Sequence, residues 1–403
     1  MSERPAMKIF LIDDEPFALR MLGHQLRTLG FTEVASFERA SDALEALERD
    51  VAAADMILLD LQMPDLDGIE FVRHLARLSF GGGVILVSGE DERILQTATT
   101  LAKAHALNVR GGLHKPVSPD QLGKLLNAPQ VNAPPARAPR KSYTPELIQQ
   151  AIANGHLVNY YQPKVELATG RVVGVETLVR WQHPEDGLVF PDQFITQAEE
   201  HQLIDALTRA VLAMALRQAR TWHDMGHPIT VAVNVSMDNL ASLDFPDFVD
   251  AALRASGVPN DRLVLEVTES RLMTNALTAL DILTRLRLKH IGLSIDDFGT
   301  GHSSLAQLRN IPFIELKIDR GFVHGADRDP ASRAIVEASL GMARQLGLRS
   351  VAEGVEDRAD WEQMREMGCD VAQGYFIARP MPADVFDRWH ADWDTHRALL
   401  FGG

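Results

Sequence analysis

The sequence predicts an α/β protein with two domains, an N-terminal doubly wound sheet of five parallel strands and a C-terminal (β/α)8 barrel with one antiparallel strand. Three observations carry this prediction. The chain has 403 residues, which is more than one ordinary core organises. Short apolar runs alternate with stretches of helical spacing in both halves of the chain. A proline-rich stretch separates the two halves.

In the N-terminal half, apolar runs at Lys8–Ile12, Met56–Leu59 and Val84–Val87 are too short for most helices. Their composition is typical of parallel strands buried on both faces. Helical spacing is found between the runs, at Ala18–Leu29 and Ala40–Arg49. This β-α-β-α order indicates a doubly wound sheet.

Residues 127–143 form the predicted linker. They include four prolines and several basic residues and show no apolar periodicity, a composition that favours an extended, semi-rigid chain. The predicted domains are therefore residues 1–126 and 144–403.

The alternation resumes after Thr144 with more units, and eight strands over about 250 residues fit a (β/α) barrel. The turn Leu167–Gly170 between the first two of these strands is too short for a crossover helix, which predicts an antiparallel hairpin. The predicted strands are Val158–Glu166, Val172–Arg180, Thr230–Asn234, Leu263–Thr268, Gly292–Asp296, Phe313–Ile318, Ser350–Glu353 and Ala372–Ile377.

Composition and net charge disfavour DNA-binding, secreted and membrane-spanning classes of protein. The net charge of −15 disfavours DNA binding, because duplex affinity depends on Lys and Arg. The single cysteine, Cys369, cannot form an intramolecular disulfide, and the first eight residues hold no apolar stretch of the kind a signal peptide needs. No uninterrupted apolar segment of about 18 residues exists, so we expect a cytoplasmic protein without a membrane span.

Polar residues follow four predicted strands of the first domain, namely Asp13-Asp14, Asp60, Ser88 and Lys115. The carboxyl ends of parallel strands meet in one crevice, so these side chains are expected to lie together. The three carboxylates can hold Mg²⁺ while Asp60 accepts a phosphoryl group, and a hydroxyl and an ammonium can bind the new phosphate oxygens. The alternative is a set of solvated loop acids.

Met7 to about Leu126 resembles the receiver domain of response regulators, since Asp13-Asp14, Asp60-Leu-Gln-Met-Pro-Asp-Leu-Asp-Gly68, Ser88 and Lys115-Pro116 stand in the family's order. The resemblance implies a flavodoxin-like sheet and phosphorylation of Asp60 by a sensor histidine kinase. Asp13 and Asp14 would bind Mg²⁺, and Ser88 and Lys115 would sense the phosphate. Receivers commonly carry an aromatic switch residue where this chain has Gly112. We therefore expect the phosphorylation signal to be transmitted through another face of the receiver.

The second domain places carboxylates and amides at the ends of most of its predicted strands, where barrel active sites form. Four oxygen donors suit one Mg²⁺, and Asp297 and Glu353 can join Asp296 on a second ion. Taken singly, Asn234 suits a strand-end cap, Lys317 a surface cation, and Asp319 and Glu356 structural partners. The four donors are Glu176, Asn234, Glu266 and Asp296.

The region from about Tyr143 to Trp389 resembles the EAL-domain phosphodiesterases, which hydrolyse cyclic di-GMP to linear pGpG. The motifs that carry the resemblance are Tyr160-Tyr-Gln-Pro-Lys164, Glu176-Thr-Leu178, Asn234-Val-Ser236, Glu266-Val-Thr-Glu269, Asp296-Asp-Phe-Gly-Thr-Gly301, Lys317-Ile-Asp319, Glu353-Gly-Val-Glu356 and Gln373-Gly-Tyr375.

This resemblance implies site roles, two Mg²⁺ or Mn²⁺ ions in the barrel beside one in the receiver, and a homodimer or higher oligomer. Glu353 would be the general base, Lys317 would orient water or stabilise charge, and Glu176 would be a catalytic metal ligand. Glu269 would anchor the loop that starts at Asp296. Substrate would be bound by Gln162, Arg180, Asp319 and Gln373.

Two other functions stay open. One is a catalytically silent cyclic di-GMP receptor, although the chain retains every expected ligand; the other is a scaffold whose receiver titrates a kinase, which Gly112 favours. His302 stands where the family usually has tyrosine. This difference affects the loop that starts at Asp296 and leaves the predicted metal ligands unchanged. No cyclase motif is present, which excludes synthesis.

Overall fold

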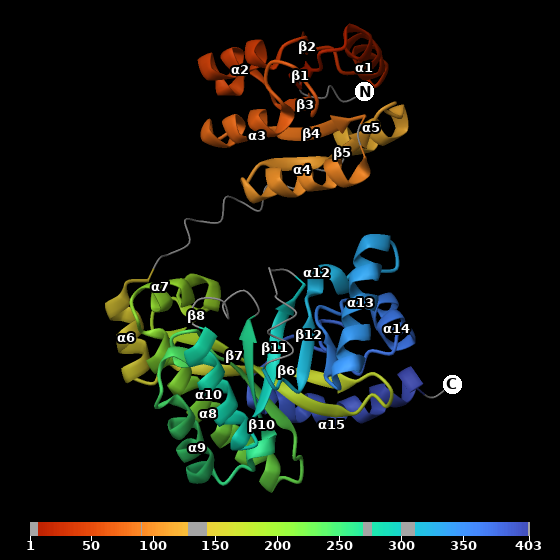
Figure 1. Cartoon of the computed structure of the whole chain (residues 1–403). Coiled ribbons are helices and arrows are strands. Elements are labelled where there is room, and N and C mark those ends of the chain that lie inside the picture. Colours follow the sequence, from red (N-terminus) through yellow and green to blue (C-terminus); the bar gives the residue numbers. More distant parts are fainter. Residues whose placement is uncertain (1–6, 90, 128–142, 269–275, 300–310, 402–403) are drawn as a thin grey trace. The chain divides into compact units, whose positions relative to one another are not determined.

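The structure, a computed structural model, describes residues 7–89, 91–127, 143–268, 276–299 and 311–401. The chain divides into two compact units, Met1–Pro139 and Arg140–Gly403, and each is considered by itself (Figure 1). Within the described ranges no helix combines the length and apolar character needed to cross a membrane. The predicted domain boundaries stay a proposal.

The first unit is a parallel sheet in the order β2-β1-β3-β4-β5. Side chains of α1 and α5 pack on one face of the sheet and those of α2, α3 and α4 on the other, which confirms the doubly wound prediction. The elements are β1 (Ile9–Ile12), α1 (Pro16–Thr28), β2 (Val34–Phe37), α2 (Ala40–Arg49), β3 (Met56–Asp60), α3 (Gly68–Arg77), β4 (Gly83–Ser88), α4 (Glu92–Ala104), β5 (Asn108–His114) and α5 (Pro119–Asn127).

The second unit is a closed barrel of eight strands to which β8 (Gly187–Val189) adds an extra strand at β7. The strand β6 runs antiparallel to both its neighbours, which confirms the predicted hairpin. The barrel strands are β6 (Leu157–Glu166), β7 (Val172–His183), β9 (Thr230–Asn234), β10 (Leu263–Thr268), β11 (Gly292–Phe298), β12 (Glu315–Ile318), β13 (Arg349–Ala352) and β14 (Val371–Ala372).

Helices surround the barrel and bury their apolar faces against it, in one continuous core that includes Trp181, Trp222 and Phe386. The longest, α8, repeats buried residues at helical spacing from Ile204 to Trp222. The helices are α6 (Pro145–Ala153), α7 (Ile195–Glu200), α8 (Ile204–Asp224), α9 (Phe245–Ser256), α10 (Ala276–Leu288), α12 (Arg320–Val323), α13 (Pro330–Leu346), α14 (Arg358–Glu366) and α15 (Ala383–Phe401).

The last predicted strand, Ala372–Ile377, is wrong beyond its first residue. The strand β14 ends at Ala372, and the amide of Ile377 donates to the carbonyl of Gly374 in a turn. Gly374 lies so close to the backbone of Val355 that a Cβ would overlap it. The segment after Ala372 is therefore a turn and not a strand.

Candidate functional site

The predicted phosphoacceptor residues of the first unit lie together at the carboxyl ends of β1, β3, β4 and β5. Oxygen atoms of Asp13, Asp14 and Asp60 lie within 4.8 Å of one another, an all-carboxylate donor set of the kind that Mg²⁺ prefers. Lys115 Nζ lies 2.8 Å from Asp13 Oδ2 and 3.2 Å from Asp60 Oδ2. Burial raises the pKa of Asp60, while the Lys115 charge opposes that rise.

Gly112 occupies the predicted switch position on β5, where it pairs with Leu86 of β4. A Cβ built at Gly112 would lie 2.6 Å from Leu95 Cγ, so the buried Leu95 of α4 fills the space beside it. An aromatic side chain cannot enter this position without displacing Leu95.

In the second unit, a cavity of about 280 Å³ opens where the barrel strands end. Its walls combine amides and carboxylates with one arginine and one tyrosine. Gln162, Glu176, Asp296, Asp297, Glu353 and Gln373, all predicted site residues, line it, together with Leu178, Arg320, Gly354, Glu356, Gly374 and Tyr375.

Lys317 lies at the centre of the predicted carboxylates, with its side chain 1% exposed. Its Nζ atom lies 2.6 Å from Glu353 Oε1, 3.0 Å from Asp296 Oδ1, 3.1 Å from Glu266 Oε2 and 3.7 Å from Glu176 Oε2. The structure therefore brings these strand ends together, as predicted. The alternative that Lys317 is a surface cation is wrong.

Burial and neighbouring charges shift the pKa values of several of these carboxylates. Burial raises the pKa of Glu353 to about 8, and although Lys317 opposes that rise, Asp296 and Glu176 add to it. Burial also raises the pKa of Asp297, which faces Asp296. Glu266 differs: despite complete burial, Lys164 and Lys317 lower its pKa to about 2. Shifts of this size, grouped in one cavity, are typical of functional sites.

Three carboxylates at the cavity lie close enough to share one cation, and other oxygen donors lie beside them. Atoms of Asp296, Asp297 and Glu353 lie within 4.8 Å of one another, which suits one divalent ion. Glu176, Glu266 and Asp296 all face Lys317, and Asn234 Nδ2 donates to Glu176 Oε1 at 3.1 Å. The amide oxygen of Asn234 then remains available as a fourth donor.

A buried glutamine, Gln373, holds Glu176 and is itself held by a second one, Gln162. Gln373 Nε2 donates to Gln162 Oε1 at 3.0 Å and also to Glu176 Oε2, while Gln162 Nε2 donates to the carbonyl of Ala378 at 3.1 Å. Of the two predicted substrate-binding amides, Gln373 therefore contacts a carboxylate directly and Gln162 contacts Gln373.

The structure places the other predicted residues apart from this cavity or leaves them undescribed. Arg180 stacks near the rings of Tyr160 and Phe190, 5.5 and 5.0 Å from their centroids, and does not line the cavity. Asp319 caps α12 by accepting from the amide of Gly321 at 2.8 Å, in line with the structural alternative. Glu269 and His302 lie outside the described residues.

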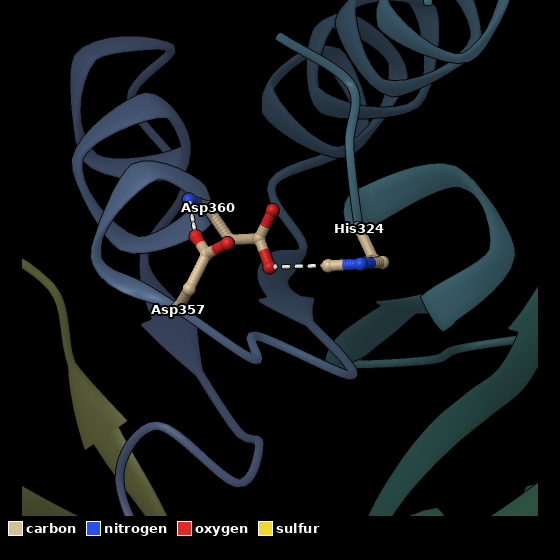
Figure 2. A group of neighbouring side chains, drawn as sticks. All are labelled: His324, Asp357 and Asp360. Carbon is tan, nitrogen blue, oxygen red and sulfur yellow. Dashed lines mark hydrogen bonds and ion pairs between the residues drawn. The ribbon is translucent and has the colours of Figure 1, made fainter. Parts of the chain in front are cut away.

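A third polar group, His324, Asp357 and Asp360, was not predicted (Figure 2). Its carboxylates already accept protein hydrogen bonds: Asp360 from His324 Nδ1 and from the amides of Gly325 and Glu356, and Asp357 from the amide of Asp360. This group therefore links the segment after α12 to the loop that follows Glu353.

Sequence reasoning also missed Lys164, Arg320 and Tyr375. Lys164 stands two residues after Gln162 on β6, so strand alternation could have placed both side chains inside the barrel. Arg320 directly follows the predicted Asp319 at a strand end. A cation beside so many acidic residues could have been recognised there as a candidate site residue. Tyr375 belonged to a recognised motif but received no role.

Comparison with known proteins identifies both units. The EAL domain family matches residues 146–380, and the response regulator receiver domain family matches residues 9–127. The cyclic di-GMP phosphodiesterase RocR of Pseudomonas aeruginosa is 34% identical over 386 residues, which cover 94% of this chain and 97% of RocR. The cyclic di-GMP phosphodiesterase NbdA of the same organism is 42% identical over 254 residues, 63% of this chain but 32% of NbdA.

Solved structures resemble the second unit. The PaMucR phosphodiesterase in complex with c-di-GMP has 44% sequence identity and a TM-score of 0.58, and the match covers 60% of this chain and 98% of that one. The EAL enzyme Bd1971 with cAMP and cyclic-di-GMP bound has 30% identity and a TM-score of 0.58, over 61% of this chain and 67% of that one.

Proposed function

Because the chain belongs to the EAL-domain family and carries a response regulator receiver domain, we propose that it hydrolyses cyclic di-GMP to linear pGpG under the control of Asp60 phosphorylation. The observation that carries the proposal is the convergence of Glu176, Asp296 and Glu353 on Lys317 in one cavity. RocR, named as a cyclic di-GMP phosphodiesterase, shares both domains over almost its whole length.

Divalent metal ions, Mg²⁺ or Mn²⁺, would activate water and stabilise charge on the phosphate oxygens. We propose that Glu176, Asn234, Glu266 and Asp296 hold one ion and that Asp296, Asp297 and Glu353 hold a second. The donor chemistry supports this assignment, since every one of these groups supplies an oxygen.

The protein side chains have separate tasks in this proposal. Glu353 accepts the proton of the attacking water at a carboxylate oxygen, and Lys317 Nζ, 2.6 Å from Glu353 Oε1, holds that carboxylate and offsets negative charge. Gln373 holds the Glu176 carboxylate, and Gln162 holds Gln373. Gln162, Gln373 and the exposed Tyr375 line the cavity, and we expect them to contact the bound dinucleotide. Arg180 and Asp319 lie outside its lining and stay predicted contacts from the sequence.

In the first unit, a sensor histidine kinase would transfer its phosphoryl group to Asp60, with one ion held by Asp13, Asp14 and Asp60. Lys115 Nζ lies within reach of the new phosphate, and we assign Ser88, which ends β4, the other phosphate contact. A homodimer or higher oligomer and a cytoplasmic location stay predictions from the sequence.

The test is an assay of the full chain with cyclic di-GMP and Mg²⁺, with and without an acyl-phosphate donor. We expect linear pGpG in both reactions and a different rate when Asp60 is phosphorylated. Binding of cyclic di-GMP without product would instead show a silent receptor. Phosphorylation without any product or nucleotide binding would favour the scaffold.

A further inference from the structure

Lys164 lies below the proposed metal site, on the floor of the barrel. The strand β6 runs against its neighbours, so its later residues lie deeper: Gln162 pairs with Glu176, and Lys164 pairs with Gly174 one layer further down. Glu315 and Ser294 are likewise two residues before Lys317 and Asp296 on β12 and β11. Strand alternation therefore gives the barrel a lower polar layer beneath the upper one.

The lower layer is joined to the upper layer through Glu266. Lys164 Nζ lies 2.7 Å from Glu266 Oε1 and 2.9 Å from Glu315 Oε1. The other oxygen of Glu266, Oε2, lies 3.1 Å from Lys317. Glu266 therefore bridges two lysines, one oxygen held from below and the other turned toward the mouth.

Glu266 and Lys164 are removed from most contact with water, since their side chains are 0% and 5% exposed, whereas Glu315, at 10%, lines a cavity of about 300 Å³ together with Lys164. Charge in such an interior must be paired, and a carboxylate that loses its partner moves or becomes protonated. Glu315 has a further donor in Ser294 Oγ at 3.0 Å, whereas the described partners of Glu266 are the two lysines.

We propose that Lys164 is a positioning residue, which holds Glu266 Oε1 at the barrel floor so that Oε2 faces the divalent ion above. This inference rests on the proposed function, because it assumes that Glu266 is a metal ligand. If Lys164 served only to balance charge, replacing Lys164 and Glu315 together would leave the affinity for the metal ion unchanged.

The paired variant Lys164→Met/Glu315→Gln separates the two roles, because it removes one cation and one anion together. Glu315→Gln is the matched control, as it changes the same layer and leaves the contact between Lys164 and Glu266.

All variants are made in the full chain carrying Asp13→Asn, which removes the receiver ion from the measurement. Mn²⁺ binding is followed by the electron paramagnetic resonance signal of the free ion, and unfolding by circular dichroism in EDTA.

We expect Glu315→Gln to bind Mn²⁺ within about twofold of the unsubstituted site and the paired variant to bind about 10–100-fold more weakly, the usual effect of removing a partner of a metal ligand. Both should unfold near the wild-type midpoint. Saturating Mn²⁺ should restore kcat in the paired variant.

Wild-type Mn²⁺ affinity in a folded paired variant would overturn the inference and leave the proposed function standing. No Mn²⁺ binding even with Lys164 and Glu315 intact would instead contradict the proposed metal site itself. Should the paired variant fail to fold, Lys164→Gln/Glu315→Gln, whose amides can bond to each other, is judged by the same affinity criterion.

Discussion

Lys317 is the buried cation around which the carboxylates of the barrel are arranged. Burial alone disfavours its ammonium group, yet Glu176, Glu266, Glu353 and Asp296 raise the pKa of Lys317 well above its usual value. The residue types and strand ends that supply this cluster could be predicted from the sequence. The burial of Lys317 could not, because alternation along Glu315–Ile318 puts Glu315 and Lys317 on one face without telling whether that face is the barrel interior or the outside.

Lys317→Met keeps much of the side-chain volume and removes the charge. Removing one partner of a buried ion pair costs about 3–5 kcal/mol, so we expect the free energy of unfolding in urea with EDTA to fall by about that amount. Adding Mg²⁺ should recover part of the loss, because the ion neutralises the remaining carboxylates. An unchanged unfolding curve in EDTA would show that Lys317 does not balance these charges.

Glu353→Gln keeps the shape of the side chain and removes the proton acceptor. General-base assistance is typically worth about 10²–10⁴-fold, so we expect turnover to fall by at least that factor while cyclic di-GMP still binds. Calorimetry with Ca²⁺ in place of Mg²⁺ measures binding, and a product assay with Mg²⁺ measures turnover. Retained turnover would remove Glu353 from the chemistry, and lost binding would make it a residue of site assembly.

At the scale of elements, Glu176, Asp296 and Lys317 lie on the barrel strands themselves, whereas Glu353 lies in the loop after β13, which contacts a neighbouring segment. Asp360, at the start of α14, accepts from Gly325 N at 3.1 Å and Glu356 N at 3.0 Å, so it ties the segment after β12 to the loop after β13. Strand positions could be predicted from apolar runs, whereas this cross-loop contact could not, because it joins residues 35 apart through a backbone amide.

The contact between His324 and Asp360 should depend on pH. The hydrogen bond to Asp360 raises the pKa of His324, with Glu356 and Asp357 as further facing acids, and the pKa of Asp360 is lowered although burial opposes this. The His324 contribution is therefore complete below its unfolded pKa of about 6.5 and is lost as pH rises through the raised folded value. The Asp360 contribution is present above about 3.9 and is lost in acid.

We therefore expect His324→Gln to lower the unfolding midpoint more at pH 5.5 than at pH 9. Arg328→Gln is the control: Arg328 is an exposed cation of the same segment, and it stays charged at both pH values. Its effect should be equal at the two pH values. A His324→Gln effect that is also equal at both would show that the imidazolium does not contribute.

At the scale of the whole molecule, two α/β units with different sheets place acids at the carboxyl ends of parallel strands, and each unit fits a different reaction of phosphate. The alternation of strands and helices was enough to predict both architectures. The final barrel strand was mispredicted because Gly374 turns the chain where apolar residues continue. The loop anchor Glu269 lies outside the described residues and stays a prediction.

Asp60→Asn should block incorporation of phosphate from an acyl-phosphate donor and leave the basal phosphodiesterase rate within about twofold of wild type. The two chemistries use separate residues in separate compact units, so the loss of one acceptor oxygen should not alter the barrel. Mass spectrometry of the treated chain provides the measurement. A phosphorylated mutant would place the acceptor at another residue.

We propose that hydrolysis of cyclic di-GMP at the barrel mouth requires a divalent metal ion held by the carboxylates. Chromatography of linear pGpG tests it most directly, in wild type and Glu176→Ala, first in EDTA and then after excess Mg²⁺ is added. We predict no product in EDTA, full recovery with Mg²⁺ in wild type, and none in a Glu176→Ala variant that unfolds at the wild-type midpoint. Product formed in EDTA, or near-wild-type turnover by Glu176→Ala in saturating Mg²⁺, would contradict the claim.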